Sequence, residues 1–289
     1  MKGKKPIYVS AEMNTTMEKL WEYTQEPHIH TEWDARFTEI SYVEKQEGEP
    51  QKFLYKTKIG FGLEIAGEGE SIGEIRKETG ECISSLKFWT DNTLSLIQIG
   101  RGYWKYTPRK EHIHFETQYD YDTRYGRIGN VIDFYMFRPL LGWATAWSFD
   151  ALKLWLEKGL HPRLLIRRTM TYWLVCFLFA FVWLYQGIVP KLIFTHPEEV
   201  KMLSVIIGLL EVIFGVIWLL PFPKRNVFIL HIFVLIALTI AAGFTNIVSF
   251  TEPFNPITLN VLLMGVSIVG YINSFDLPSA KNCKRKRKG

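Results

Sequence analysis

The sequence predicts a two-part chain, in which a water-soluble α+β domain is followed by an all-α four-helix transmembrane bundle. Three observations predict this division. Residues 1–168 alternate apolar and polar side chains as antiparallel strands do, residues 169–275 hold four long windows with almost no charge, and the charges divide at the same place. The first 168 residues carry 24 basic and 24 acidic side chains, whereas the remaining residues carry 10 and 5.

Composition excludes several classes of protein. The formal net charge is +5, but six of the basic residues follow Ser279, so neither half has the charged stripe of a nucleic-acid-binding domain. The cysteines Cys82, Cys176 and Cys283 have no paired spacing, which argues against a disulfide scaffold, a zinc ribbon or a thiol-redox motif. The first ten residues contain no apolar run, so no secretory signal peptide is expected.

The second half contains four apolar windows, each long enough to cross a bilayer. A span needs about 20 residues at about 1.5 Å of rise per residue. Prolines punctuate the turns between the windows, as expected where helices break. The windows are Thr169–Val189, Met202–Leu220, Asn226–Phe250 and Ile257–Phe275.

Basic residues beside these windows predict the orientation in the cell membrane. Four spans place both termini on one side, where eleven Lys and Arg residues fall, against Lys191 and Lys201 on the other side. Positive charge collects on the cytoplasmic side of membrane proteins, so we expect a multi-pass protein with cytoplasmic N- and C-termini. The eleven residues are Arg163, Arg167, Arg168, Lys224, Arg225, Lys281, Lys284, Arg285, Lys286, Arg287 and Lys288.

One carboxyl group lies inside a predicted span. Gly208, Glu211 and Gly215 are spaced i, i+3 and i+7, so they share a helix face that packs on a neighbouring helix. A charge near the bilayer centre is costly, so Glu211 is expected to be paired, hydrogen-bonded or protonated, and His231 is one candidate partner. Glu211 is interpreted either as a proton-accepting or ligand-contacting group or as a protonated side chain that hydrogen-bonds two helices together. A second polar layer is expected from Gln186, Asn246 and Asn260.

Three stretches of this half carry a family resemblance. They are YQGIVPKL (Tyr185–Leu192), GLLEVIFGVIWLLP (Gly208–Pro221) and FNPITLNVLLMGVSIVGYI (Phe254–Ile272). Together they resemble the DoxX-like family of four-span membrane proteins over roughly residues 169–274. The resemblance implies a membrane bundle and raises the question of a membrane protein partner, because some relatives act beside quinone-linked or thiol-redox systems. No redox motif in this chain supports the same activity.

The first half has the pattern of a strand-rich domain that ends in one long helix. In Leu63–Ile75, apolar residues and glycines alternate with glutamates, and Ile113–Tyr121 repeats this period of two. Helical patterns occur near Thr15–Thr24 and Val131–Lys158. Further strands are expected near Ile7–Glu12, Phe37–Val43, Lys52–Ile59, Glu81–Trp89 and Leu96–Tyr106.

This order of elements includes two distinctive stretches, TTMEKLWEYTQEPHIHTEWDARFTEI (Thr15–Ile40) and FRPLLGWATAWSFDALKLWLEKG (Phe137–Gly159). The combination resembles the SRPBCC superfamily of START-like domains, also called polyketide cyclase/dehydrase and lipid-transport proteins. The resemblance implies an α+β helix-grip fold, in which a sheet curls around the long helix and leaves an apolar cavity. The predicted parts are a cytoplasmic domain 1–160, a basic linker 161–168, a membrane domain 169–275 and a basic cytoplasmic tail 276–289.

Residues that suit such a cavity occur on inward strand faces and on the long helix. Gly67, Gly69 and Gly73 remove side chains where a core would otherwise be filled, although glycines there also suit bulges that bend a sheet. Apolar and aromatic groups are the usual lining of small-ligand sites, and plain packing is the alternative for each of them. The further candidates are Phe115, Tyr119, Tyr121, Phe134, Phe137, Leu141 and Trp147.

No catalytic or cofactor motif stands out. The sequence has no glycine-rich nucleotide loop, nucleophile elbow or zinc-protease helix, so no cofactor is expected. His112 and His114 have a chelating spacing, but they share a charged strand face with Glu116 and Asp120, so no metal site is expected. The basic tail is interpreted either as an anchor to anionic lipid or as a stop that fixes topology.

Three functional hypotheses follow from these patterns. The leading one is a membrane-tethered binding module whose cytoplasmic cavity holds an apolar small molecule, a lipid or a quinone-like compound, next to the membrane lipid that dissolves it. A rival is an enzyme of the polyketide cyclase/dehydrase kind, with Arg101, Tyr103 or His30 as cavity groups. A third places the activity in the bundle, as a redox or transport accessory subunit that uses Glu211 as a proton relay.

Overall fold

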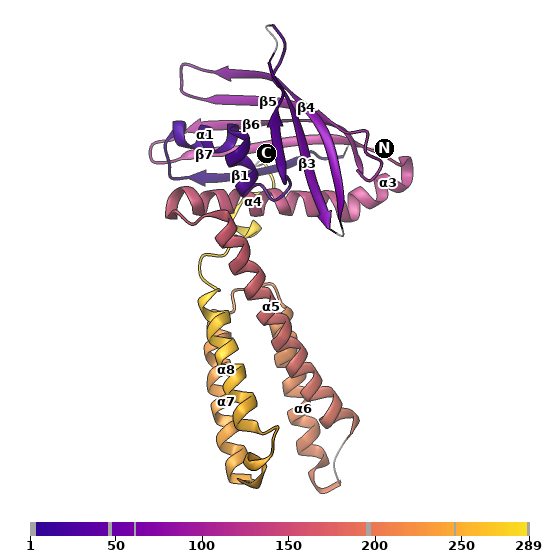
Figure 1. Cartoon of the computed structure of the whole chain (residues 1–289), viewed down its shortest axis with the longest axis vertical. Helices are drawn as coiled ribbons and strands as arrows, with labels where there is room; N and C mark the ends of the chain where they lie inside the picture. The colour runs from indigo at the N-terminus through magenta and orange to yellow at the C-terminus, as the bar shows by residue number, and fades with distance from the viewer. Residues whose placement is uncertain (1–3, 46–47, 61, 195–197, 246, 288–289) are drawn as a thin grey trace. The chain divides into compact units, whose positions relative to one another are not determined.

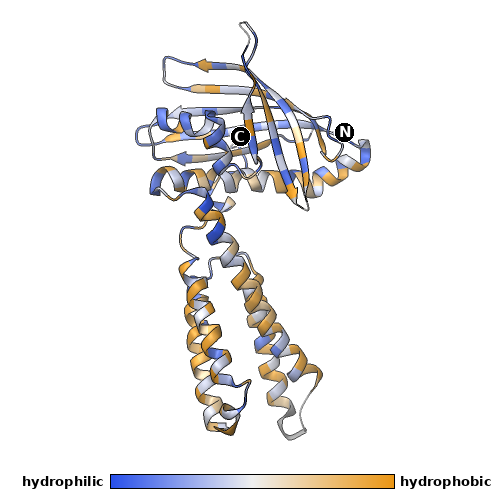
Figure 2. Ribbon diagram, viewed as in Figure 1, coloured by the Kyte–Doolittle hydropathy of each residue, from blue (hydrophilic) through white to orange (hydrophobic). Residues whose placement is uncertain are grey.

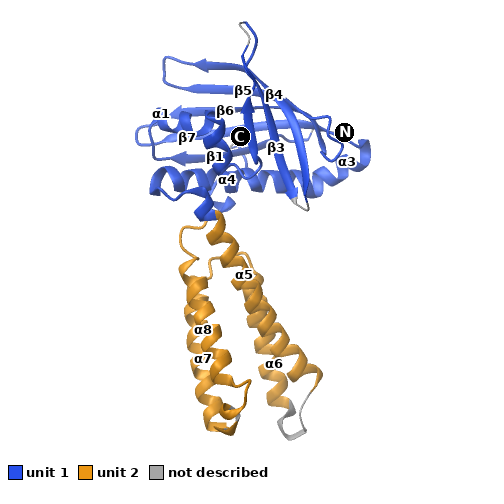
Figure 3. Cartoon of the chain, viewed as in Figure 1, with its two compact units in different colours: residues 1–165, 278–289 blue, residues 166–277 orange. Residues whose placement is uncertain are grey.

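The chain folds into two compact units. The computed structural model describes residues 4–45, 48–60, 62–194, 198–245 and 247–287. Unit 1 consists of residues 1–165 and 278–289, and unit 2 consists of residues 166–277 (Figure 3). The division at residue 165 lies within the linker predicted from the sequence. The C-terminal tail, predicted as a separate segment, belongs to unit 1.

Unit 1 is built on a seven-stranded antiparallel sheet (Figure 1). The strands are β1 (Ile7–Met13), β2 (Glu39–Tyr42), β3 (Lys52–Gly60), β4 (Leu63–Arg76), β5 (Cys82–Trp89), β6 (Ile97–Pro108) and β7 (Ile113–Thr123). Their spatial order is β1-β7-β6-β5-β4-β3-β2, so consecutive strands from β2 to β7 are neighbours and β1 is added beside β7. A meander of this kind needs only short hairpin connections.

A 3-10 turn, η4 (Ala280–Asn282), lies in the C-terminal tail of unit 1. The other helices of unit 1 occupy two places along the chain. They are α1 (Met17–Gln25), α2 (Pro27–Trp33), α3 (Gly126–Ile132), the π-helical turn η1 (Asp133–Phe137) and α4 (Arg138–Lys158). The first two fill the connection between β1 and β2, and the other three follow β7 without interruption. Gly159 ends α4 with a φ of 68°, the left-handed conformation that favours glycine at a helix end. A sheet that holds one long C-terminal helix confirms the predicted α+β helix-grip fold.

The main core of unit 1 lies between the sheet and α4. Phe115 of β7 and Phe149 of α4 are fully buried and stack with ring centroids 4.6 Å apart. Burial of one such ring contributes about 1.5–3 kcal/mol. The alternation predicted for β7 is confirmed, because its inward residues are all buried. They are Ile113, Phe115, Thr117, Tyr119 and Tyr121.

The C-terminal tail completes this core at the edge of the sheet. The backbone N–H of Ser10 in β1 donates to the Lys284 carbonyl, and the Lys284 N–H donates to the Ser10 carbonyl, both at 2.9 Å. Nearby, Ala280 and Cys283 are buried within the core. The basic tail is therefore held in a fixed place on unit 1 through its backbone and its apolar residues, which the sequence prediction of a separate tail did not include.

Unit 2 consists of apolar helices. They are α5 (Pro162–Gly187), the π-helical turn η2 (Ile188–Ile193), α6 (Glu198–Leu219), α7 (Arg225–Thr245), the 3-10 turn η3 (Ile247–Thr251) and α8 (Pro256–Ile272). Figure 2 shows hydrophobic residues along most of their length. α5 begins at Pro162, so the predicted linker is helical.

Each of the four windows predicted from the sequence is occupied by one of these helices. Within the described residues, three helical stretches are long and apolar enough to cross a membrane, namely Pro162–Ile193, Met202–Leu219 and Arg225–Thr245. The fourth window corresponds to α8, which is apolar but shorter, at 17 residues. That length is at the lower limit for a spanning helix.

Candidate functional site

Unit 1 contains a cavity of about 630 Å³ between the sheet and the helices. Its apolar wall comes from strands β3 to β7 and from the start of α4. The aromatic and aliphatic side chains of this wall include Phe53, Tyr55, Leu86, Phe88, Ile97, Leu140 and Ala144. Charged lining residues such as Glu26, Lys45 and Glu74 are at exposed positions, so the cavity wall is mainly apolar where it is buried. Its size and lining are those of a small-molecule site.

Glycines in neighbouring strands determine where the aromatic rings of this wall lie. Phe53 pairs with Gly69 and Tyr55 pairs with Gly67 across β3 and β4. A Cβ atom added at either glycine would lie 2.3 Å from the opposite ring, so each ring lies directly over its glycine. Gly100 holds the ring of Phe88 in the same way, with a 2.2 Å approach.

The predicted role of the glycines is therefore revised. Gly67 and Gly69 do leave space on the inward face, but rings from β3 occupy that space and become the lining. Gly73 lies where the register between β4 and β5 shifts, after Ser71. This position agrees with the alternative that a glycine here suits a bulge. An aromatic residue directly opposite a glycine on the neighbouring strand indicates this arrangement. The sequence alone does not reveal it, because the register between β3 and β4 must be known first.

The predicted aromatic and aliphatic candidates divide into two groups. The residues that line the cavity are Tyr119, Phe137 and Leu141. Burial raises the pKa of the Tyr119 hydroxyl, which shares a 2.7 Å hydrogen bond with the Thr145 hydroxyl. Tyr119 is therefore a neutral polar group in this wall.

The other four candidates lie elsewhere in unit 1. Phe115 belongs to the core against Phe149, and the Tyr121 hydroxyl donates to the Asp133 carboxylate at 2.6 Å. Phe134 is 61% exposed on the surface. Trp147 packs with Ala151 and Leu165 in a separate cluster. Strand alternation could not separate Phe115 and Tyr121 from Tyr119, because all three are buried on the same face of β7. Helical spacing could not place Phe134 and Trp147, because the helix phase changes at the π-helical turn η1.

A buried ion pair is the main polar feature of the cavity wall. Asp34, directly after α2, has no exposed side-chain surface and accepts hydrogen bonds from Arg36 Nε at 2.8 Å and Nη2 at 2.6 Å. His30 Nε2 lies 2.9 Å from the same carboxylate. Burial alone would raise the pKa of Asp34, but the charge and hydrogen bonds of Arg36, together with His30, hold it well below its ordinary value.

Arg36 is placed to face the interior of the cavity. It lines the cavity together with His30, and its guanidinium carbon lies 5.4 Å from the ring centroids of both Phe37 and Tyr119. His30 was predicted from the sequence as a cavity group, whereas Asp34 and Arg36 were not. The available signal was two opposite charges with one residue between them, directly after a helix that ends in a buried tryptophan.

A second polar group lies at the α1 side of the cavity. The Tyr106 hydroxyl is within 2.7 Å of the Thr24 hydroxyl and accepts from Gln25 Nε2 at 2.9 Å. Ser84 Oγ donates to Gln25 Oε1 at 3.4 Å. These groups satisfy one another, so the hydroxyls and the amide form a closed network that orders α1 on the sheet.

The remaining titratable candidates give no catalytic constellation. Arg101 is exposed on β6, and the Tyr103 hydroxyl donates to Gln118 Oε1 at 3.5 Å. His112 and His114 both contact the carboxylate of Glu12, at 3.0 and 2.9 Å. Among the residues that the structure describes, no group of three or more His, Cys, Asp or Glu side chains is arranged to hold a metal ion.

In unit 2, Glu211 is paired with a lysine. Lys191 Nζ of η2 lies 2.6 and 2.8 Å from the two carboxylate oxygens of Glu211 in α6, and it also donates to the Gln186 carbonyl at 3.3 Å. His231, the partner suggested from the sequence, does not make this contact. The face that carries Glu211 packs closely, since a Cβ at Gly208 would lie 2.9 Å from the Gly187 carbonyl oxygen. The ion pair accounts for the burial of this carboxyl group as a link between α6 and η2.

His231 instead joins three helices. Trp183 Nε1 of α5 donates to His231 Nε2 at 3.0 Å, which leaves the proton on Nδ1 to be donated to Ser267 Oγ of α8 at 2.7 Å. Asn260 Nδ2 of α8 donates to Thr239 Oγ1 of α7 at 2.8 Å. Asn246 lies outside the described residues.

Comparisons with known proteins agree with this architecture. A sequence model of the DoxX-like family matches residues 180–268. The uncharacterized membrane protein YndG of Bacillus subtilis (strain 168) is 45% identical over 285 residues, which cover 98% of both chains.

Solved structures similar to the helix-grip half are more distant. A fragment of a STAR-related lipid transfer protein from Xanthomonas axonopodis is 7% identical, with a TM-score of 0.35, over 43% of this chain and 75% of the other. Protein CV1439 from Chromobacterium violaceum is 15% identical, with a TM-score of 0.38, over 53% of this chain and 97% of the other. Because similarity to YndG extends over nearly the full length of both chains, the chain belongs to the same family as this uncharacterized membrane protein, and its apolar helices contain a DoxX-like domain.

Proposed function

We propose that the protein is a membrane-tethered binding module and that the cavity of unit 1 holds an apolar small molecule, either a lipid or a quinone-like compound. The observation that carries this proposal is the cavity of about 630 Å³, whose wall is aromatic and aliphatic and includes Arg36, which is paired with the buried Asp34. A wall of this kind binds an apolar body by burial and orients it through a few polar groups.

The ion pair suggests the chemistry of the polar end of the ligand. Asp34 takes the Nε and one Nη2 hydrogen of Arg36, so the charge of the guanidinium is already neutralised. Arginine has five N–H donors in all, and those left over can donate to a ligand oxygen. A neutral carbonyl or hydroxyl fits better than a second anion, which would compete with Asp34 for the same cation.

The membrane is the natural source of such a ligand. The apolar helices and the YndG relationship make this a membrane protein, and α5 begins at Pro162, four residues after α4 ends at Lys158. The tail supports an even number of membrane crossings. Residues before and after unit 2 both belong to unit 1, so the chain returns to the side of the membrane from which it left. A cytoplasmic location is supported by the basic residues that flank the apolar helices.

Native mass spectrometry of the full-length protein tests this function. We expect wild-type protein, released from detergent, to retain a small apolar adduct. Ala144→Trp should abolish the adduct, because Ala144 lines the cavity and the indole would fill it. Ala66→Trp adds the same side chain at an exposed position of β4 outside the lining and should retain the adduct.

The pair of variants also separates the cavity from other lipid sites. An adduct bound to the apolar helices would persist in both variants. Equal retention in Ala144→Trp and Ala66→Trp, or the lack of any adduct in the wild type, would overturn the proposed function.

A further inference from the structure

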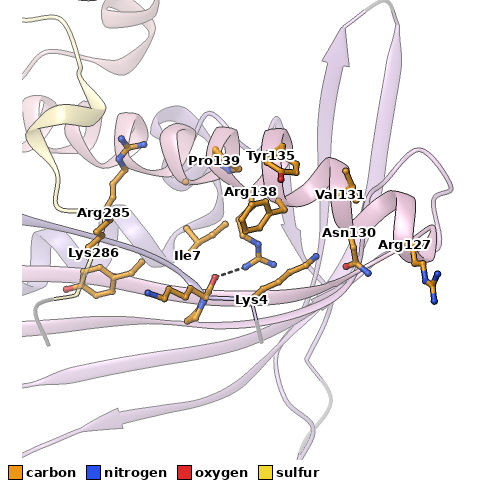
Figure 4. A pocket seen from close by; sticks show the side chains of 15 residues that line it. Lys4, Ile7, Arg127, Asn130, Val131, Tyr135, Arg138, Pro139, Arg285 and Lys286 are labelled. Atoms are coloured by element: carbon orange, nitrogen blue, oxygen red, sulfur yellow. Dashed lines mark hydrogen bonds between the residues drawn. The ribbon is translucent and has the colours of Figure 1, made fainter. Parts of the chain in front are cut away.

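A second hollow lies on the surface of unit 1, separate from the cavity. It has a volume of about 990 Å³ and is formed by the segment before β1, by α3, η1 and the start of α4, and by the C-terminal tail (Figure 4). It shares no lining residue with the cavity. Three segments that are far apart in the sequence thus meet in one groove.

The groove is strongly basic. Its lining contains six cationic side chains and no Asp or Glu, and the six are Lys4, Lys5, Arg127, Arg138, Arg285 and Lys286. Two of these are engaged, since Lys4 Nζ and Arg138 Nε contact the buried Asp133 carboxylate at 2.7 and 3.1 Å. Among the described residues, the other four form no ion pair, so their charge faces solvent.

One nitrogen at the bottom of the groove is left without a partner. Arg138 has 11% of its side chain exposed and donates through Nη1 to the Lys5 carbonyl and to Asp120. Its Nη2 is buried and has no hydrogen-bond partner within the described chain. A buried donor of this kind is costly unless something outside the chain accepts from it. An anionic oxygen in the groove would do so.

Beside the basic residues, the helix exposes large apolar side chains. Ile128 is 72% exposed, Phe134 is 61% exposed and Tyr135 is 77% exposed. Val131 and Met136 are 58% and 63% exposed on the same short segment. Such a concentration is unusual on a water-facing surface. Aromatic and aliphatic groups flanked by Lys and Arg are the composition of helices that lie in a membrane interface.

From these features we propose that this surface docks on the lipid bilayer and binds the headgroups of anionic phospholipids. We call it the lipid-docking surface and define it as Lys5, Arg127, Arg285 and Lys286 together with Ile128, Val131, Phe134, Tyr135 and Met136. The cations attract the headgroup phosphates, and the apolar side chains enter the boundary between headgroups and acyl chains. A bilayer is within reach because the chain enters its first apolar helix within four residues of Lys158.

Charge favours a bilayer over the other possible occupants. A second copy of this surface would oppose basic residues to basic residues, and an acidic soluble peptide would leave the aromatic side chains in water. Each Lys or Arg near an anionic leaflet strengthens binding by about fivefold. Four cations that act together therefore make a surface that depends strongly on lipid charge and on salt.

The test uses the full-length protein with a bimane fluorophore at Met136→Cys, since the three native cysteines are buried. The probes are nanodiscs of phosphatidylcholine alone and of an equimolar mixture of phosphatidylcholine and phosphatidylglycerol. We expect the bimane emission to shift to shorter wavelength in the anionic discs and to return when the ionic strength is raised. A bimane at Ile75→Cys, which is 55% exposed on β4, should show no such shift.

Charge variants then link the shift to the groove. Arg127→Glu with Lys286→Glu should abolish the shift, and the milder pair Arg127→Gln with Lys286→Gln should reduce it. Lys58→Glu with Lys110→Glu makes the same charge change at exposed positions outside the groove and should leave the shift intact.

The proposal would be overturned by equal emission in the two kinds of disc or by a shift that survives Arg127→Glu with Lys286→Glu. A shift that appears in detergent without lipid and grows with protein concentration would also overturn it, because a second copy would then cover the surface. The outcome is independent of the cavity test, since neither set of variants touches the lining of the other site.

Discussion

At the scale of single residues, Asp34 illustrates how a buried charge is kept in unit 1. Its carboxylate is fully buried, and Arg36 and His30 supply the contacts that replace water. The pKa of Asp34 lies below its ordinary value in the folded chain. The stabilisation from the ionised carboxylate is therefore present at neutral pH and is lost only as the pH falls below that ordinary value.

Asp34→Asn should destabilise unit 1 strongly. The substitution leaves Arg36 in the cavity wall without its counter-charge, and breaking a buried pair in this way costs about 3–5 kcal/mol. Pulse proteolysis in urea on the detergent-solubilised full chain would measure the change through cleavage of unit 1. Glu39→Gln is the matched control, because Glu39 and Lys56 are 56% and 41% exposed and their pair is worth at most about 1 kcal/mol. Equal losses in both variants would contradict the structural account of Asp34.

Residue types alone predicted part of the cavity. Tyr119, Phe137 and Leu141 were recognisable from alternation and helical spacing, and they line it. Phe53 and Tyr55 were not, because their place in the wall depends on the glycines opposite them in β4. Register between strands is a long-range property, and a local pattern does not contain it.

At the scale of elements, the C-terminal tail is the part that hydropathy could not predict. Ser279 N–H and Asn282 Nδ2 each donate to Asp150 Oδ2 of α4 at 2.8 Å, and Cys283 is buried near Ala146. We call these contacts with α4, together with the backbone bridge between Lys284 and Ser10, the clasp. The clasp involves only a few tail residues, so the tail sequence shows no strand or helix periodicity. Its lysines and arginines instead predicted a lipid anchor or a stop that fixes topology.

Removal of the tail should expose one specific amide of β1. Because neighbouring residues of a strand point their N–H groups to opposite sides, Ser10 donates to the tail, whereas Val9 and Ala11 face β7. Hydrogen–deuterium exchange on a chain that ends at Pro278 should show fast exchange at Ser10 and slow exchange at Val9 and Ala11. Continued protection of Ser10 would count against the clasp.

The long helices were the most predictable elements. Absence of charge over about 20 residues is a strong signal, and α5, α6 and α7 all lie within the predicted windows or extend them. The partner of Glu211 was less predictable, because Lys191 lies in η2, close to the proline turn. Helical spacing indicated that Glu211 faces a neighbour, but it could not identify which residue.

At the scale of the whole molecule, unit 1 constrains how often the chain crosses the membrane. Residues 165 and 278 belong to one compact unit, so the intervening apolar helices must return the chain to the side from which it left. Three crossings would violate this requirement. α8, although only 17 residues long, is therefore needed as a fourth crossing if the three longer helices all span.

Thiol labelling in intact cells tests the orientation. With cytoplasmic termini, the connection between α7 and α8 is outside, so Thr251→Cys should react with a membrane-impermeant maleimide. Lys58→Cys, exposed on β3 in unit 1, should react only after the cells are permeabilised. The three native cysteines are buried and give little background. Labelling of Lys58→Cys in intact cells, with Thr251→Cys labelled only after permeabilisation, would show that the orientation is the opposite one.

The bridge between Ser10 and Lys284 also bears on how the protein is made. Residue 284 is synthesised only after α5 to α8, so this edge of unit 1 stays open while those helices are made. A nascent chain that stops before the tail retains an unpaired β1 edge, which chaperones and proteases recognise. Closure of that edge can therefore occur only after these helices have been made.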